Sequence, residues 1–511
     1  MSGRFVRASK FRHVFGTAAR KEQCYENVTI TRSSLEGKFC AANSKFVAVC
    51  IYAGGGGSFL VIPHDRYGRQ DINAPKVAGH SNDVLDLEWN PFNDNMIASS
   101  DEDGAIKIWE IPDGGLTTNL NSPLLTVNHQ KKVSQLSWHP VAANILLSVS
   151  YEPCVAVWNL ETGEQVTEIE HPDQVYNAEW NEIGSKIVSA CKDKFFRIIN
   201  PRTGEVIQKF KGHVGGKPQR VIFLTDERLF STGFTKMSSR EYAVWDLKNT
   251  SEALFEDQLD SANGTLVPYY DRDTKILYVA GRGDSTIRYY EITDEEPYAH
   301  WITNFQSKLP HRGVCMSSKR AVDVNRNEVA LFYRLLSDKH MVEPVSFTVP
   351  RKGDTFQQDI YPDTPGDEPA LTADEWCQGK DAEPKRVSMQ DFFMSKDKKK
   401  ATGLGHKVGS KTGLKPAAVS AAPAASATSA STPAATAADS AEVVHLQSEI
   451  KGLKDNEKKL KDEITSLRSE VSELKKLKDE FAAIKGAVKR NAERVDALES
   501  MVQEVSDDEA K

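Results

Sequence analysis

Histidine, aspartate and tryptophan recur together in the first 300 residues. Gly79-His80 precedes Asp103 and Trp109, and a second histidine, His213, precedes Trp245. An aspartate beside a histidine is a pairing that general acid–base catalysis uses. The same side chains can instead hydrogen-bond one another inside a closely packed sheet and so satisfy their buried polar atoms. Because the group repeats along the chain, the sequence favours this structural relay.

The expected relay members belong to successive units of the chain. Each acidic member stands six residues before a tryptophan or before the residue that replaces it. The predicted members are His80, Asp103, Trp109, Trp158, Asp193, His213, Trp245 and Asp284.

Short apolar or alternating strands must position these side chains, and one such strand recurs. Its copies begin at residues 59, 106, 155, 196, 242, 287 and 329, at intervals of 41 to 49 residues. This is the spacing of WD-repeat blades, none of which can bury its apolar face alone. The sequence therefore predicts an all-β, seven-bladed WD-repeat β-propeller over residues 1–350.

A closed ring needs a clasp, because an open sheet edge exposes unpaired backbone groups. Residues 4–14 are strand-like and are expected to complete the last blade. Residues 351–395 are expected to form an extension packed on the propeller, since Phe356, Ile360, Tyr361 and Trp376 are too apolar for a free linker. Trp376 is the expected anchor.

The composition changes after residue 395. Residues 396–440 are first basic and then rich in Ala, Ser, Thr and Pro, which predicts a disordered linker. Residues 441–505 are predicted to form an oligomerising coiled coil, because apolar residues recur every seventh position. Residues 506–511 form an acidic tail. The predicted coil core is Leu446, Leu453, Leu460, Leu467, Leu474, Phe481, Val488, Val495, Leu498 and Val502.

The end of the coil carries a hexad that favours three strands. Arg494 and Glu499 flank Val495 and Leu498, so an inter-chain Arg–carboxylate pair could cover the core. β-Branched residues combined with leucine favour a parallel dimer instead, and a three-residue change of register at Leu474 keeps a tetramer open. The sequence predicts a homo-oligomer, with the trimer favoured and the dimer and tetramer open.

Composition and motifs exclude several classes of function. The 511 residues carry a net charge of -7, with no signal-peptide pattern and no apolar run long enough for a membrane span. The seven cysteines lack metal-ligand spacing, and no phosphate loop or nucleophile elbow is present. We therefore expect an intracellular protein that is not an enzyme, with no cofactor, no metal and no nucleic acid as partner.

Several stretches resemble the coronin family. They are SKFRHVFG at residues 9–16, QCYEN at 23–27, NSKFVA at 43–48, GGGSFLV at 55–61, NDNMIAS at 93–99, WEIPDGGL at 109–116, GRGDSTIRYY at 281–290, TVPR at 348–351 and PALTADEW at 369–376. The resemblance implies a propeller that binds filamentous actin and a coiled coil that oligomerises the protein and can engage the actin-nucleating Arp complex. It also implies a cytoplasmic location in the actin cytoskeleton and cell cortex.

One departure concerns the expected filament contact. Many relatives carry an arginine after Cys-Tyr-Glu-Asp-Val, whereas Thr29 follows the matching stretch here. The candidate actin-binding residues are therefore Arg32 and the cluster Arg7, Lys10 and Arg12, unless affinity is lower than in those relatives. The lysine run from residue 396 is a further candidate for weak contact with an anionic membrane.

Three functions remain open from the sequence. The first is an organiser that binds and cross-links actin filaments through several propellers on one coil. The second is a WD-repeat scaffold or adaptor for trafficking or signalling partners, with actin binding incidental. The third is a propeller enzyme, which would need acidic or histidine clusters at the top of the central channel, and the sequence shows none.

Overall fold

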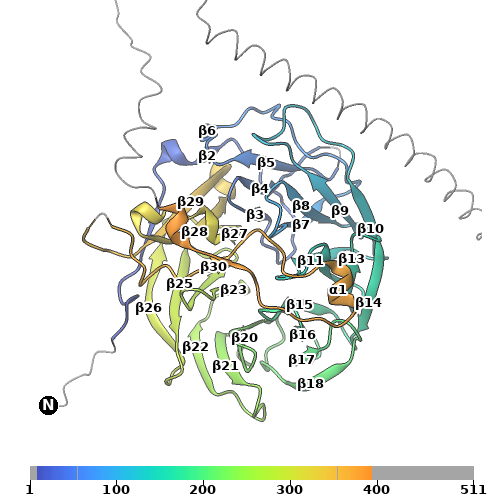
Figure 1. Ribbon diagram of the computed structural model, residues 1–511, viewed down its shortest axis with the longest axis vertical. Helices are drawn as coiled ribbons and strands as arrows, with labels where there is room; N and C mark the ends of the chain where they lie inside the picture. The colour runs from blue at the N-terminus through green and yellow to red at the C-terminus, as the bar shows by residue number, and fades with distance from the viewer. Residues whose placement is uncertain (1–7, 55, 354, 394–511) are drawn as a thin grey trace, which may run out of the picture. The chain divides into compact units, whose positions relative to one another are not determined.

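The computed structural model describes residues 8–54, 56–353 and 355–393. Within them, seven antiparallel sheets stand around a central axis, and Figure 1 shows the ring viewed approximately along that axis. The predicted seven-bladed β-propeller is confirmed. The expected linker at 396–440, coiled coil at 441–505 and acidic tail at 506–511 lie outside the described residues.

Blades 2 to 6 each consist of four consecutive antiparallel strands. In chain order these are β7 (Val84–Trp89), β8 (Met96–Asp101), β9 (Ala105–Glu110) and β10 (Leu125–Asn128); β11 (Val133–Trp138), β12 (Ile145–Ser150), β13 (Cys154–Asn159) and β14 (Glu164–Glu170); β15 (Val175–Trp180), β16 (Ile187–Cys191), β17 (Phe195–Ile199) and β18 (Val206–Lys211); β19 (Arg220–Phe223), β20 (Arg228–Phe234), β21 (Arg240–Asp246) and β22 (Phe255–Asp260); β23 (Leu266–Asp271), β24 (Ile276–Gly281), β25 (Thr286–Ile292) and β26 (Ala299–Gln306).

The first and last blades depart from this pattern. Blade 1 has the strands β3 (Cys40–Ala42), β4 (Phe46–Cys50) and β5 (Phe59–Pro63), and blade 7 has β27 (Gly313–Met316), β28 (Glu328–Leu336) and β29 (Met341–Thr348). Two short strands, β2 (Tyr25–Glu26) and β6 (Gly68–Arg69), extend the sheet of blade 7. Four single turns of 3-10 helix lie in its connections: η1 (Lys21–Gln23), η2 (Lys319–Ala321), η3 (Val324–Arg326) and η4 (Ser337–Lys339).

Burial explains why the inner and outer strands differ in sequence. The second strand of each blade packs between neighbouring sheets, and every residue of β12 and β16 is buried. Such strands are short apolar runs, because both of their faces meet protein. The outermost strands expose one face, and β18 buries only Phe210. The small serines inside the buried strands need partners, which the relay described below provides.

An N-terminal strand closes the ring, at a position one residue beyond the predicted one. β1 (Phe15–Ala18) pairs antiparallel with β29, with Phe15 opposite Thr348 and Ala18 opposite Val345. The prediction placed the closing strand at residues 4–14. The described part of that segment is not a strand, but it buries Phe11 and Val14 against the core of blades 6 and 7. The apolar residues of this segment therefore pack in the core immediately before the strand.

The extension crosses the ring, is anchored by a buried tryptophan, and then returns to pair with its own first strand. In Figure 1 it is drawn in orange and leads from blade 7 to the helix α1 (Ala373–Cys377), near β13 and β14. Trp376 is fully buried and donates its indole N–H to the Gly184 carbonyl at 3.2 Å. The extension also contains β30 (Thr364–Pro365), β31 (Arg386–Val387) and the 3-10 turn η5 (Met389–Phe392). None of the helices within residues 8–393 has the length and hydropathy of a membrane span.

Candidate functional site

The relay of blade 2 is built around a serine. Trp109 donates its indole N–H to Ser99 Oγ at 2.7 Å, and Ser99 Oγ lies 2.5 Å from His80 Nε2. His80 Nδ1 lies 2.7 Å from a carboxylate oxygen of Asp101. All four side chains are buried, so each polar atom needs the next one. The prediction that Asp103 is the acidic member of this relay is wrong, because Asp101 occupies that place.

Asp103 does not contact His80, because it lies on the outer side of the turn. It is exposed, and its carboxylate accepts a hydrogen bond from Asn82 at 3.1 Å. Asp101 ends the buried strand β8 and therefore points at the histidine.

The same serine-centred relay recurs in blades 3 and 5. Trp158 donates to Ser148 at 2.8 Å and Trp245 donates to Ser231 at 2.8 Å. His129 and His213 contact these two serines, each at 2.8 Å. Sequence reasoning missed the serines, although each of them lies in the buried second strand of its blade.

The other two predicted acids are also wrong as relay members. Asp193, in the turn before β17, forms an ion pair with Arg197, four residues later on that strand. Asp284 forms ion pairs with Arg240 at 2.9 Å and Arg288 at 3.4 Å. Their units carry Ile199 and Tyr290 where a relay tryptophan would stand. Like Asp103, both aspartates lie in the turn between the second and third strands and not on the buried second strand.

The loop before blade 1 is held by arginines from three distant blades. Arg282 donates to the carbonyls of Ser34 and Leu35, both at 2.7 Å. Arg220 donates to the Glu36 carbonyl at 2.7 Å, and Arg312 donates to the Ser33 carbonyl. These arginines come from blades 5, 6 and 7, respectively Arg220, Arg282 and Arg312. We call residues 32–37 the arginine-braced loop.

The brace concentrates positive charge beside the loop. Arg282 Nη1 lies 3.6 Å from the Glu36 carboxylate, the one acidic side chain of the loop. Burial lowers the pKa of Arg220, and burial together with the charge of Arg282 lowers the pKa of Arg312. The loop carbonyls therefore offset part of the repulsion within a crowded cationic group.

The brace presents Arg32, the first residue of the loop. Arg32 is exposed, and its guanidinium lies over the Tyr52 ring at 4.7 Å. Tyr52 is itself 46% exposed. A guanidinium stacked on an aromatic face is held in place without losing its hydrogen-bond donors. Thr29, in the position where an arginine was expected, is also exposed.

Family comparisons match the segments that build these features. A model described as a domain of unknown function (DUF1899) matches residues 4–69, which include the arginine-braced loop. The WD domain, G-beta repeat model matches residues 74–110, which contain the relay of blade 2. A further type of WD40 repeat matches residues 342–384.

Solved structures give the same relationship. The crystal structure of the WD40 domain from Toxoplasma gondii coronin is 30% identical, with a TM-score of 0.70 over 74% of this chain and 97% of that chain. The chain belongs to the coronin family. A chain in the crystal structure of the mitotic checkpoint complex is 14% identical, with a TM-score of 0.49 over 65% of this chain and 95% of that chain, too remote to add to the argument.

The candidate cations of this coronin-family propeller lie on opposite faces. Loops between the second and third strands of each blade define the upper face, and loops between the first and second strands define the lower face. Arg32 contacts Tyr52, which follows the second strand of blade 1 and so lies on the upper face. Lys10 donates to the Asp359 carbonyl at 2.7 Å, and the adjacent Ser9 donates to Glu291, near the end of a third strand.

Third strands end on the lower face, because neighbouring strands in a blade are antiparallel. Lys10 and the exposed Arg12 therefore lie at the lower face, whereas Arg7 is outside the described residues. Lys10 and Arg12 therefore do not share a surface with Arg32.

The central channel contains an acidic group that the sequence analysis missed. Lys38 donates to Glu88 at 2.6 Å, above a cavity of about 520 Å³ that Glu179 also lines. Burial raises the pKa of Asp86 to about 6 and that of Glu179 to about 7, although Lys38 opposes both shifts. Glu88 and Glu179 each precede the tryptophan that ends an innermost strand, which is the signal that could have found them.

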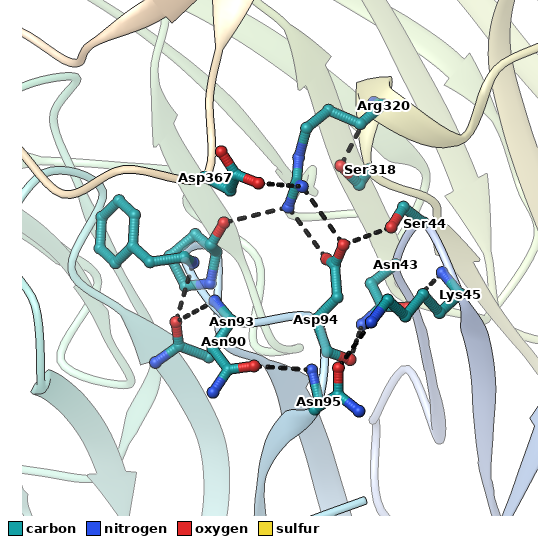
Figure 2. Close-up of polar contacts among 12 residues, drawn as sticks. Asn43, Ser44, Lys45, Asn90, Asn93, Asp94, Asn95, Ser318, Arg320 and Asp367 are labelled. Carbon is teal, nitrogen blue, oxygen red and sulfur yellow. Dashed lines mark hydrogen bonds and ion pairs between the residues drawn. The ribbon is translucent and has the colours of Figure 1, made fainter. Parts of the chain in front are cut away.

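An ion-pair network lies on the lower face of the propeller, and Figure 2 shows its contacts around Arg320 and Asp94. Arg320 of blade 7 pairs with Asp94 of blade 2 at 2.9 Å and with Asp367 of the extension at 3.5 Å. Asp94 also accepts a hydrogen bond from Ser44 of blade 1. The network joins the first, second and last blades beneath the extension.

Proposed function

We propose that this coronin-family protein binds actin filaments through the upper face of its propeller, with Arg32 as a principal contact. Family membership supports actin as the partner. The observation that carries the choice of face is the bracing of residues 32–37 by Arg220, Arg282 and Arg312.

Bracing matters because an ordered loop loses little entropy on binding. A flexible arginine must be immobilised at a cost of about 0.5–1.5 kcal/mol. Arg32 is already held against Tyr52, and the carbonyls behind it are tied to three blades. Its exposed guanidinium can then form charge-assisted hydrogen bonds with carboxylates on the acidic surface of a filament.

The proposal extends to filament cross-linking. A homo-oligomer formed through residues 441–505 would carry several propellers, and linked binding sites gain affinity through effective concentration. We propose a trimer, with the hexad from Arg494 to Glu499 as its stabilising feature, and the actin-nucleating Arp complex as a second partner of the coil. The protein would then work in the cytoplasm, at the actin cytoskeleton and cell cortex.

We also propose that the channel carboxylates are structural rather than catalytic. Asp86 accepts a hydrogen bond from the Leu136 amide at 2.9 Å, and Glu179 accepts one from Gln135 at 3.0 Å. Glu88 is paired with Lys38. Each acid therefore has an internal partner that joins two blades.

Sedimentation with actin filaments tests the proposal. We expect the full chain to pellet with filaments at high speed and to bring bundles down at low speed. A protein ending at residue 395 should still bind but should lose bundling and most of its apparent affinity. Equal bundling by the truncated protein would contradict the cross-linking model, and absence of filament binding by the full chain would contradict the proposed function.

A further inference from the structure

In the relay of blade 3, the histidine and the acidic side chain lie farther apart than in the relays of blades 2 and 5. His129 Nδ1 lies 3.5 Å from Glu152 Oε2, whereas the matching histidine–carboxylate distances are 2.7 Å for His80 and 2.7 Å for His213. A separation of 3.5 Å is too long for a good hydrogen bond. The second oxygen of Glu152 is buried and has no hydrogen-bond partner in the described part of the chain.

A cysteine lies beside the same histidine and glutamate. Cys154 is buried, and its Sγ lies 3.6 Å from Glu152 Oε2. The potential ligand atoms of His129, Glu152 and Cys154 all lie within 4.8 Å of one another. The place of Cys154, four residues before the relay tryptophan, is taken by Ala105 in blade 2 and by Glu241 in blade 5. Of these three relays, blade 3 alone combines imidazole, carboxylate and thiol.

We propose that His129, Glu152 and Cys154 bind a zinc-like divalent cation on the upper face of blade 3. Tetrahedral zinc with ordinary bond lengths separates its ligand atoms by about 3.3–3.6 Å. The observed separations of 3.5 Å and 3.6 Å already match this geometry. A mixed nitrogen, oxygen and sulfur set suits zinc better than magnesium or calcium, which prefer oxygen alone.

The surroundings supply the remaining requirements of a metal site. The His129 ring is oriented from behind, because its Nε2 contacts Ser148 at 2.8 Å and Trp158 anchors that serine. The Glu152 side chain is 17% exposed, which leaves a route for the ion and room for a water as fourth ligand. The cation would bind the Glu152 carboxylate and link the turn before β13 to the loop before β11.

Cobalt substitution of the full-length protein tests this site. A Co²⁺–thiolate bond gives a near-ultraviolet charge-transfer band, so the probe reports on the cysteine itself. We expect the wild-type chain to develop the band on addition of about one equivalent of Co²⁺ and to lose it when Zn²⁺ is added. Zn²⁺ should also raise the melting temperature, because it binds the folded state.

Cys154→Ala and Cys191→Ala make a matched pair of variants. Both remove a buried thiol, and alanine already stands in the place of Cys154 in blade 2. Cys154→Ala should keep the wild-type circular dichroism spectrum but lose both the band and the zinc-dependent rise in melting temperature. Cys191→Ala should retain both. The proposal is overturned if the wild-type chain gives no band, or if Cys154→Ala gives a band equal to that of wild type.

Discussion

Removal of the Ser99 hydroxyl tests the serine-centred relay. In Ser99→Ala, the buried indole N–H of Trp109 and the Nε2 atom of His80 both lose their hydrogen-bond partner. Leaving a buried polar group unsatisfied costs about 1–3 kcal/mol, so two such groups predict a loss of about 2–6 kcal/mol in the free energy of unfolding. The contact between His80 and Asp101 remains, which keeps the effect local.

The neighbouring residue supplies the control. Ser100 is equally buried but makes one hydrogen bond, to the Val133 carbonyl at 3.1 Å. Ser100→Ala removes one hydrogen bond to a backbone carbonyl and leaves no aromatic or imidazole N–H without a partner. We therefore expect the free energy of unfolding to fall by about 1 kcal/mol. Asp103→Asn, at the exposed turn position, should change the stability by less than about 0.5 kcal/mol.

Urea unfolding followed by tryptophan fluorescence measures the three variants. The predicted order of destabilisation is Ser99→Ala, then Ser100→Ala, then Asp103→Asn. If Ser99→Ala cost no more than Ser100→Ala, the serine would not be the centre of the relay. A large effect of Asp103→Asn would restore the turn aspartate to the relay and refute the reasoning from burial.

Three further predictions concern the extension, the channel and the loop. Trp376→Ala should lower the free energy of unfolding by about 3–5 kcal/mol, because it leaves a cavity between blades 3 and 4. It should also make the extension more sensitive to limited proteolysis. An unchanged cleavage pattern would contradict the anchoring role of Trp376. Burial raises the pKa of Glu179 to about 7 in the folded protein. Its contribution to the free energy of unfolding is therefore fully present below about pH 4 and is lost as the pH rises through 7. Glu179→Gln should therefore flatten the fall in stability between pH 5 and pH 8 by about 1–2 kcal/mol in urea titrations, and a variant as pH-dependent as wild type would contradict the assignment. Arg282→Lys keeps the charge but cannot hold both loop carbonyls, so filament affinity in cosedimentation should fall several-fold; an unchanged affinity would show that bracing does not matter.

The blade count could be predicted from the sequence because the pattern is repeated. One strand copy carries little information, but seven at a common spacing define a ring. Trp109, Trp158 and Trp245 could be placed for the same reason, since each lies one residue before the end of the third strand of its unit.

The details of the relay could not be predicted, because they depend on side-chain direction. Asp101 and Asp103 differ by two residues in one turn, and only the end point of the buried strand decides which carboxylate meets His80. In blade 5 the acid is Glu241, on the strand after the turn, so no fixed spacing finds it.

The arginine-braced loop was beyond prediction because its partners are distant in sequence. Arg220, Arg282 and Arg312 lie between 184 and 279 residues from the carbonyls that they hold. Ring closure brings blade 7 beside blade 1, whereas Arg220 reaches the loop from the innermost strand of blade 5 and Arg282 from blade 6. No local pattern records these contacts. The fold also places Arg32 on the opposite face from Lys10 and Arg12, a separation that their positions along the chain do not indicate.

The dissociation constant of the full chain for actin filaments, compared among face-specific variants, tests the central claim most directly. We predict that Arg32→Ala weakens binding about 10-fold or more, as expected for loss of a charge-assisted contact of about 1.5–3 kcal/mol. The double variant Lys10→Ala/Arg12→Ala, on the lower face, should bind within about two-fold of wild type, since rim or solvated charges contribute little. Wild-type affinity for Arg32→Ala, combined with lost binding in the lower-face variant, would contradict the account.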